Sequence, residues 1–480
     1  MQVEVEERIP WRSESVSMSR NVPRCFREYN LNQPLLLPQD LREWLPEDHL
    51  AHFILDLLAE AKLDLSAIYA AYATRRGGQP PYHPRMLVAL LLYGYCIGVR
   101  SSRKIERATY TDAAFRMLAG DQHPDHDTIA EFRRRHLQEL AGLFVQVLRL
   151  CQKAKLVALG HVALDGTKER ANASKHKAMS YERMEKSEAE LAAEVERMLA
   201  EAEAVDRAED AQYGKGVRGD ELPEDLRFKQ KRLATIRKAM KSLEAEAKEK
   251  AEVKRAERAA EEERLRVEGK SAPPRQEISE TVEPKAQRNF TDPESRIMKD
   301  GATKSFEQCY NAQAAVDAKA QIIVAAAVTQ EANDKQQVKP VVEAIQRNCD
   351  GAAPKKLLAD NGYFSEANVE YLQGEGIDPY LATGRLKHHE KAPPAPRGRV
   401  PKSASIKDRM ARKLRTLRGR ATYSKRKEIV EPVFGQIKGA RGIRQFLLRG
   451  LEKVTAEWTL ICLTHNVLKL ARSGWRPAAA

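Results

Sequence analysis

Three acidic residues, far apart in the chain, lie in local patterns in which carboxylates can bind metal ions. Asp165 lies in HVALDGTK, Asp360 in KKLLADNGYFS, and Glu431 in YSKRKEIVEPVFGQIK. Carboxylate oxygens are ligands that Mg²⁺ prefers, and the ion keeps waters and substrate phosphates in its shell. Two such ions, about 4 Å apart, can activate the attacking oxygen and stabilise the leaving oxygen of a phosphodiester. The three residue types therefore predict a metal-dependent site for phosphoryl transfer.

Two of these carboxylates are predicted at the ends of strands. Residues 161–168 are short, apolar and β-favouring, and their Asp-Gly pair predicts that the strand breaks at Asp165. A second apolar segment ends at Asp360, so both carboxylates should meet at one edge of a sheet. Gly166 and Gly362 follow the aspartates and would allow a substrate backbone to approach closely.

The remaining segments between residues 309 and 471 predict the rest of an α/β unit. Residues 309–329 predict two strands joined by a turn near Asp317, which we interpret as a turn residue. A helix is expected at 334–348, another strand at 377–383, and a last helix at 452–471 that closes the core.

The N-terminal part of the chain, from about residue 40 to residue 150, is predicted to be helical. Its longest apolar run, MLVALLLYGYCIGV, is shorter than the roughly 18 residues that a membrane span needs, which favours a buried core helix. In PDHDTIAEFRRR, Asp125 or Asp127 is expected to cap a helix. We prefer this interpretation to a metal site that these aspartates would form with His123 and His126. The arginines that follow, Arg133 to Arg135, are either a solvated face or a contact to a polyanion.

Residues 180–268 are rich in Ala, Glu, Lys and Arg, with apolar residues three or four positions apart. This spacing predicts two helices that fold back on each other as an antiparallel coiled-coil hairpin. The polar faces of such helices cannot form a globular core, so the hairpin is interpreted as an insertion, either a spacer or a self-association arm.

The charge of the chain indicates a polyanionic partner. Its formal net charge is +14, and residues 385–449 contain 20 Lys and Arg against 4 Asp and Glu. Such an excess favours nucleic acid first and an anionic membrane second. The histidines at 388 and 389 lie in this basic stretch, where we interpret them as solvated or close to phosphate. The polar N-terminus contains no secretory signal, and the cysteines form no C-x-x-C pair, which predicts a cytoplasmic protein without structural zinc.

Taken together and in this order, the motifs resemble the DDE transposases of bacterial insertion sequences. DGT at 165–167, ADNGY at 359–363 and the spacing from Glu431 to Lys438 match the pattern around that family's three acidic residues. HPRMLVALLLYGY and PDHDTIAEFRRR resemble the helical domain that precedes catalysis in the group. The likeness covers about residues 40–170 and 295–470.

The resemblance implies the fold, the cofactor and the partners. It implies an RNase H-like α/β catalytic domain, a mixed sheet with flanking helices, with Asp165 on the first strand, Asp360 on the fourth and Glu431 on a late helix. The implied cofactor is Mg²⁺ or Mn²⁺, as two ions. The implied partner is double-stranded DNA, both terminal repeats and target, bound by a homodimer or a higher oligomer, near the nucleoid and without a membrane.

The family's helical signature also implies residues that contact DNA. Tyr423 and Arg426 have the expected spacing from each other, and Lys438 is in register with Glu431. Arg426 lies one residue too far from Glu431, so Lys427 is the alternative for the basic role. Arg133 and Arg134 of the N-terminal helices are further DNA-contact candidates.

Pro432 introduces a competing third ligand. Proline cannot donate to the carbonyl four residues earlier, so we expect the helix to start or kink there. Glu428 is then the alternative to Glu431. Glu431 and Lys438 are two helical turns apart and so share a face.

We expect an N-terminal arm at 1–39, an all-α DNA-binding domain at 40–155, a catalytic domain at 156–178 and 290–472, and the coiled-coil insertion at 179–289. Three alternatives remain open: a nuclease of the same fold without strand transfer, a decayed or repurposed DNA-binding protein, and a coiled-coil scaffold. The last leaves the two strand-end aspartates without a role.

Overall fold

The structure is a computed structural model, and it describes residues 40–59, 62–72, 80–213, 224–267, 277–299, 305–384, 394, 397–401 and 403–476. The N-terminal arm predicted for residues 1–39 and the histidines at 388 and 389 lie outside these residues.

The centre of the molecule is a six-stranded mixed sheet, in which β1 lies between an antiparallel neighbour and a parallel one. The strand order is β4-β5-β1-β7-β8, and β6 also pairs with β5. The strands are β1 (Val162–Arg170), β4 (Arg296–Lys299), β5 (Phe306–Asp317), β6 (Ile323–Thr329), β7 (Lys356–Ala359) and β8 (Asp378–Leu381). The turn predicted near Asp317 is confirmed, because its carboxylate accepts the amide of Lys319 at 2.9 Å.

The prediction that the first strand ends at Asp165 is wrong. β1 continues for five residues beyond it, and all nine residues of β1 are in register with β5, from Val162 opposite Asp317 to Arg170 opposite Cys309. An Asp-Gly pair is a turn signal only where no partner strand competes. Here β5 supplies a partner for the whole of β1, so Asp165 lies in the middle of the strand.

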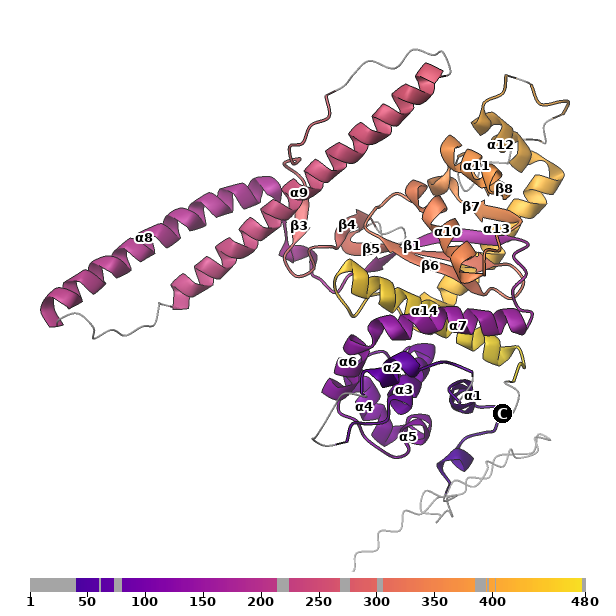
Figure 1. The fold of residues 1–480 in the computed structure, drawn as a ribbon, viewed down its shortest axis with the longest axis horizontal. Coiled ribbons are helices and arrows are strands. Elements are labelled where there is room, and N and C mark those ends of the chain that lie inside the picture. Colours follow the sequence, from indigo (N-terminus) through magenta and orange to yellow (C-terminus); the bar gives the residue numbers. More distant parts are fainter. Residues whose placement is uncertain are drawn as a thin grey trace, which may run out of the picture.

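Helices cover both faces of the sheet. Trp458 is fully buried on the last helix, and its indole N–H donates to the carbonyl of Gln313 on β5 at 2.9 Å. That helix lies between the sheet and the N-terminal helices (Figure 1). The elements following the sheet strands are η3 (Lys335–Gln337), α10 (Val338–Asn348), η4 (Asn361–Tyr363), α11 (Glu366–Gly374), α12 (Ile406–Arg415), α13 (Leu417–Gly435), a π-helical turn η5 (Gln436–Ala440) and α14 (Leu451–Arg472).

The N-terminal region is helical, as predicted. The apolar run forms the core helix α3, of which 11 residues are buried, and Asp125 caps α6 by accepting the amide of Thr128 at 2.7 Å. One hydrophobic cluster joins these helices to the sheet through α14. The elements are η1 (Leu41–Trp44), α1 (Leu50–Leu57), α2 (Ser66–Ala70), α3 (Pro84–Ile97), α4 (Ser102–Thr111), α5 (Ala113–Ala119), α6 (His126–Arg135) and α7 (Leu137–Lys153).

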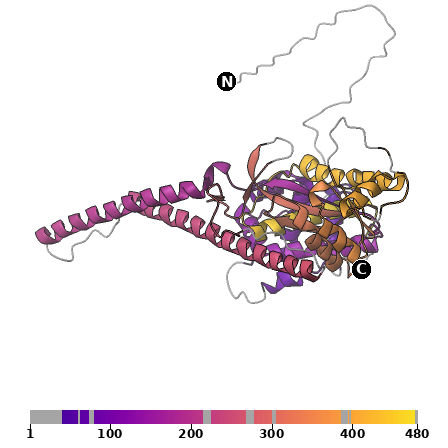
Figure 2. The same ribbon diagram turned by 90° about the horizontal axis from the view of Figure 1, so that it is seen from above.

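Between β1 and β4 the chain forms two long helices that lie side by side away from the sheet, and the second continues past their common base in the opposite direction (Figures 1 and 2). These are α8 (Tyr181–Tyr213) and α9 (Glu224–Val267). At their base lies a two-stranded ribbon of β2 (Ala178–Ser180) and β3 (Gln287–Asn289), preceded by the short helix η2 (Lys175–Lys177). We call α8 and α9 together the arm.

Within the described part of the chain, no helix is long and apolar enough to cross a membrane. The five cysteines of that part are buried and form no disulfide bond.

Candidate active site

Asp165 and Asp360 lie side by side on neighbouring parallel strands. Val162 of β1 is opposite Leu357 of β7, and Ala163 is opposite Leu358. Continuing this register by two residues places Asp165 opposite Asp360, the first residue after β7. Pairing at the sheet thus brings together two carboxylates that are almost 200 residues apart in sequence.

The carboxyl group of Asp165 is hard to ionise in this environment. Burial raises the pKa of Asp165 to about 6; the guanidinium of Arg426 opposes this rise, and the nearby Asp360 adds to it. Arg426 of α13 donates to Oδ2 of Asp165 at 2.9 Å, and the two side chains are only 13% and 23% exposed. Tyr423, one turn earlier on α13, lies near the same groups, and its own pKa is raised chiefly by burial.

A third aspartate, Asp334, lies close to this pair and was not predicted. A Cβ atom added at Gly362 would lie 3.0 Å from Oδ1 of Asp360 and 3.2 Å from Oδ2 of Asp334. One added at Gly166 would lie 3.0 Å from Oδ1 of Asp334. The nearest atom to that added at Gly166 would be Nε2 of Gln313, at 2.4 Å. Both glycines therefore leave room for the polar side chains that crowd them, in addition to any approach of a substrate.

Polar side chains on β5 hold Asp334 in place. The side-chain amides of Asn311 and Gln313 donate to its Oδ1 at 2.6 and 2.8 Å. The buried hydroxyl of Tyr363, three residues after Asp360, donates to Oε1 of Gln313. Burial, followed by the charges of three aspartates, raises the pKa of Tyr363, so that its hydroxyl stays a neutral donor.

Part of this network left a signal in the sequence. Asn311 and Gln313 are polar residues two positions apart in a strand that is otherwise buried and mostly apolar, which is a pattern that indicates a polar contact on one face. Asp334 left no such signal, since it follows β6 in a short irregular segment.

Glu431 lies on α13, the helix that provides Arg426, and its side chain is exposed. Within α13 it lies about 140° around the helix axis from Arg426, and Glu428 lies about 160° away in the other direction. Lys438 reaches β1, where its Nζ lies 2.9 Å from Oε1 of Glu169. Arg426 and the buried Ile429 and Val433 define the face of α13 that packs on the sheet. Neither glutamate lies on that face.

The helix does not start at Pro432, because α13 runs from Leu417 to Gly435; a kink at this residue stays a prediction. The carbonyl of Glu428, which proline leaves without a helical donor, accepts the side-chain amide of Gln321 at 2.8 Å instead. A side chain from the β5–β6 turn thus compensates for the proline.

The basic residues predicted to contact DNA lie in different environments. Lys427 is exposed. Lys438 is paired with Glu169, and burial raises the pKa of Glu169 although this lysine opposes the rise. Arg133 is 7% exposed and donates to the carbonyl of Arg100 at 2.9 Å, which gives it a structural contact inside the helical region. Arg134 is 67% exposed and bonds to Glu131.

Asp165 and Asp360 fit a hard divalent cation by their chemistry, because both offer carboxylate oxygens. Burial raises the pKa of one of them, so a cation between them would relieve an unfavourable charge. Among the described residues, no three His, Cys, Asp or Glu side chains lie close enough together to hold one ion. Glu431 is thus not part of a preformed three-carboxylate cluster in this conformation.

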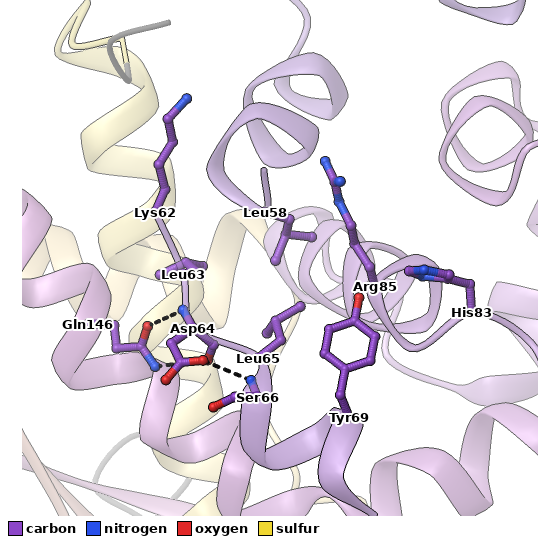
Figure 3. Close-up of a pocket in the computed structure, with 10 residues that line it drawn as sticks. All are labelled: Leu58, Lys62, Leu63, Asp64, Leu65, Ser66, Tyr69, His83, Arg85 and Gln146. Carbon is purple, nitrogen blue, oxygen red and sulfur yellow. Dashed lines mark hydrogen bonds between the residues drawn. The ribbon is translucent and has the colours of Figure 1, made fainter. Parts of the chain in front are cut away.

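A hollow of about 730 Å³ on the N-terminal helices lies elsewhere (Figure 3). Its lining includes Lys62, Asp64, Arg85 and Gln146, and none of the predicted site residues. Its polar groups bond within the protein: the amide of Asp64 donates to Gln146 at 2.7 Å, and Arg85 donates to the carbonyl of Leu55 at 3.1 Å. The hollow offers no chemistry that competes with the two aspartates.

Comparison with known proteins finds two family matches. Residues 39–135 match a family described as a transposase domain, and residues 278–467 match a transposase DDE domain. The second match includes Asp360 and Glu431, whereas Asp165 lies between the two matched regions. No curated protein and no solved structure matches the chain.

Proposed function

The chain belongs to the DDE transposases of insertion-sequence type, and we propose that Asp165, Asp360 and Glu431 are its catalytic carboxylates. The observation that carries this proposal is the register of β1 and β7, which pairs the first two of them. We further propose that the sheet and its helices form an RNase H-like domain, that the arm is a coiled-coil insertion, and that the helices before residue 156 bind the terminal repeats.

In this proposal, Asp165 and Asp360 bind Mg²⁺ or Mn²⁺, and Glu431 completes the ligand set when DNA is bound. Two bound ions supply positive charge that stabilises the attacking and leaving oxygens of a phosphodiester. Water attacks the phosphodiester at the end of the element and frees a 3′-hydroxyl. That hydroxyl then attacks a phosphodiester of the target DNA and displaces a second 3′-oxygen. Positioning and charge stabilisation are sufficient, so no covalent enzyme intermediate forms.

Arg426 has a distinct role in this scheme. In the absence of a cation it is the counter-ion of Asp165, at 2.9 Å, and it limits the rise in the pKa of that carboxyl group. The planar donors of this guanidinium are also well suited to a phosphate, so Arg426 would contact the DNA backbone beside the carboxylates that would hold the cation. Tyr423 lies beside it and is the second candidate for a contact to DNA.

The test is cleavage of DNA that carries the element's flanking ends, with and without Mg²⁺ or Mn²⁺. Wild type is compared with Asp165→Asn, Asp360→Asn and Glu431→Gln, and Glu428→Gln is the matched control on the same helix. We expect the first three to abolish cutting while DNA binding persists, and the control to cut normally. If Glu431→Gln cuts normally and Glu428→Gln does not, the third ligand is Glu428.

The products distinguish the alternatives. Joined products on a target duplex are expected of a transposase, whereas cut ends without joining would indicate a nuclease. Wild-type protein that binds the ends but never cuts them would indicate a repurposed DNA-binding protein.

A further inference from the structure

The two helices of the arm pack through an apolar seam with opposite charges beside it. Leu226, Leu233 and Ile236 of α9 are buried against α8, where Met184 and Val195 are buried in return. Ion pairs flank the seam: Lys229 of α9 lies 2.7 Å from Glu194 of α8, and Arg237 lies 2.7 Å from Glu188. The seam therefore orients α9 and leaves its opposite face to solvent.

That opposite face of α9 carries a continuous row of positive charge, which we call the α9 stripe. Its members are exposed, and none has an ion-pair partner among the residues that the structure describes: Arg227, Lys231, Lys238, Lys241 and Lys248. At 100° per residue they fall within about one third of the helix circumference. Only small or uncharged residues, such as Ala234 and Ala245, lie between them, and no carboxylate interrupts the row.

Charged contacts fix the base of the arm against the rest of the molecule. Glu246 of α9 accepts from Arg288 at 2.9 Å and from Arg296 at 2.5 Å, and Arg288 is only 2% exposed. Tyr181, at the start of α8, donates to Glu244 at 2.8 Å. The stripe begins at the start of α9, which packs against the middle of α8, and it ends beside this anchor, so it is held in one direction relative to the sheet (Figure 1).

We propose that the α9 stripe binds the phosphate backbone of double-stranded DNA. The proposal rests on the proposed function, which makes DNA the substrate of the sheet to which the arm is anchored. From Arg227 to Lys248 the helix rises about 31 Å. A duplex carries one negative charge for about every 1.7 Å of its axis, so five exposed cations over this length face a strongly complementary surface.

A second copy of the chain fits the stripe less well. The outward face of α8 is the acidic surface that such a contact would use, but Arg183, Lys186 and Arg197 are interspersed among its glutamates. Arg197 lies within 4.0 Å of both Glu194 and Glu201, so part of that negative charge is already compensated. DNA offers a uniform negative surface and is the better partner.

The test measures the salt dependence of binding to a labelled duplex of mixed sequence, using full-length protein. The stripe variant carries Lys231→Gln, Lys238→Gln and Lys241→Gln. The control variant carries Arg183→Gln, Lys186→Gln and Arg197→Gln on α8 of the same arm. Glutamine has nearly the helix propensity of lysine and arginine, so both variants keep the helices, which circular dichroism checks.

Each phosphate contact contributes about 0.9 to the slope of log affinity against log salt concentration. We expect the stripe variant to flatten the slope by about 2.7, and the control variant to leave it unchanged. Equal slopes for wild type and the stripe variant would overturn the inference about the stripe. DNA binding by the wild type would in that case still support the proposed function. A stripe variant that instead loses self-association in sedimentation, without DNA, would assign the stripe to contacts between copies. Wild type that binds no DNA would refute the proposed function itself.

Discussion

Replacing Asp165 by asparagine should change how the stability of the metal-free protein depends on pH. Burial raises the pKa of Asp165 from 3.8 to about 6, with Arg426 opposing and Asp360 adding to the rise. The folded protein therefore holds this proton more tightly than the unfolded chain does. Ionisation of Asp165 destabilises the fold as pH rises through the interval between those two values.

The size of the effect follows from the two pKa values. At about 1.36 kcal/mol for each pH unit, the difference corresponds to about 3 kcal/mol in total. Roughly 1.3 kcal/mol of this develops between pH 5 and pH 7. The asparagine side chain has no proton to lose, so the free energy of unfolding of the variant, minus that of wild type, should grow by this amount over the same interval. The attraction of Arg426 adds no separate contribution, because it acts on the ionised carboxyl group and is already contained in the pKa of about 6.

Urea unfolding followed by tryptophan fluorescence, at several pH values and with a chelator present, measures this difference. Trp458 is fully buried beside β5 and reports on the sheet. In an Asp360→Asn background, Asp165 loses a neighbouring negative charge, so its pKa should fall and the pH-dependent part should shrink. A difference between wild type and variant that is constant from pH 5 to pH 7 would refute the argument that burial holds Asp165 protonated.

Three further substitutions test other parts of the structure. Tyr363→Phe removes the donor to buried Gln313 and should cost about 1–3 kcal/mol of unfolding free energy; an unchanged urea midpoint would show that this bond does not hold the loop after β7. Glu457→Gln removes the charge that pairs with the buried Arg100 at 3.0 Å and should cost about 3 kcal/mol of unfolding free energy in the same assay. A loss below about 1 kcal/mol would contradict a tight buried ion pair. Gly166→Ala should lower the free energy of unfolding by about 1–3 kcal/mol and should also lower cleavage, because the new methyl group meets polar side chains around Asp334. The control is Gly142→Ala on α7, where the methyl group meets nothing within 4 Å and should be neutral or stabilising. Similar losses of stability in both variants would argue against crowding at the site.

Much of the element order could be predicted from the sequence, because it depends on local patterns. The spacing of apolar residues predicted α3 and α14, and the apolar runs before Asp360 and around Asp317 predicted β7 and the β5–β6 turn. Both aspartates of the pair were chosen on these grounds, with the family resemblance. These predictions worked because helix period and strand length are properties of a few consecutive residues.

The surroundings of the site could not be predicted in this way. Asp334 becomes part of the site only because β5, β1 and η4 meet, and Asn311 and Gln313 hold it through contacts between segments far apart in the chain. Arg133 looked like its exposed neighbour Arg134, yet only its side chain is directed into the helical core. A run of arginines does not indicate which of them will be buried, since that depends on helices that pack against it.

By itself the sequence determined the local elements, the excess of positive charge and the two aspartates beside apolar strands. The tertiary structure alone decided that β1 continues past Asp165, because the strand's partner, β5, follows it by more than 100 residues. It also decided the register that sets Asp165 opposite Asp360, the ion pair between Arg426 and Asp165, and the direction of the basic face of α9 away from α8. Each of these outcomes depends on pairing between distant segments, and the free energy of such pairing is not contained in any short window of residues.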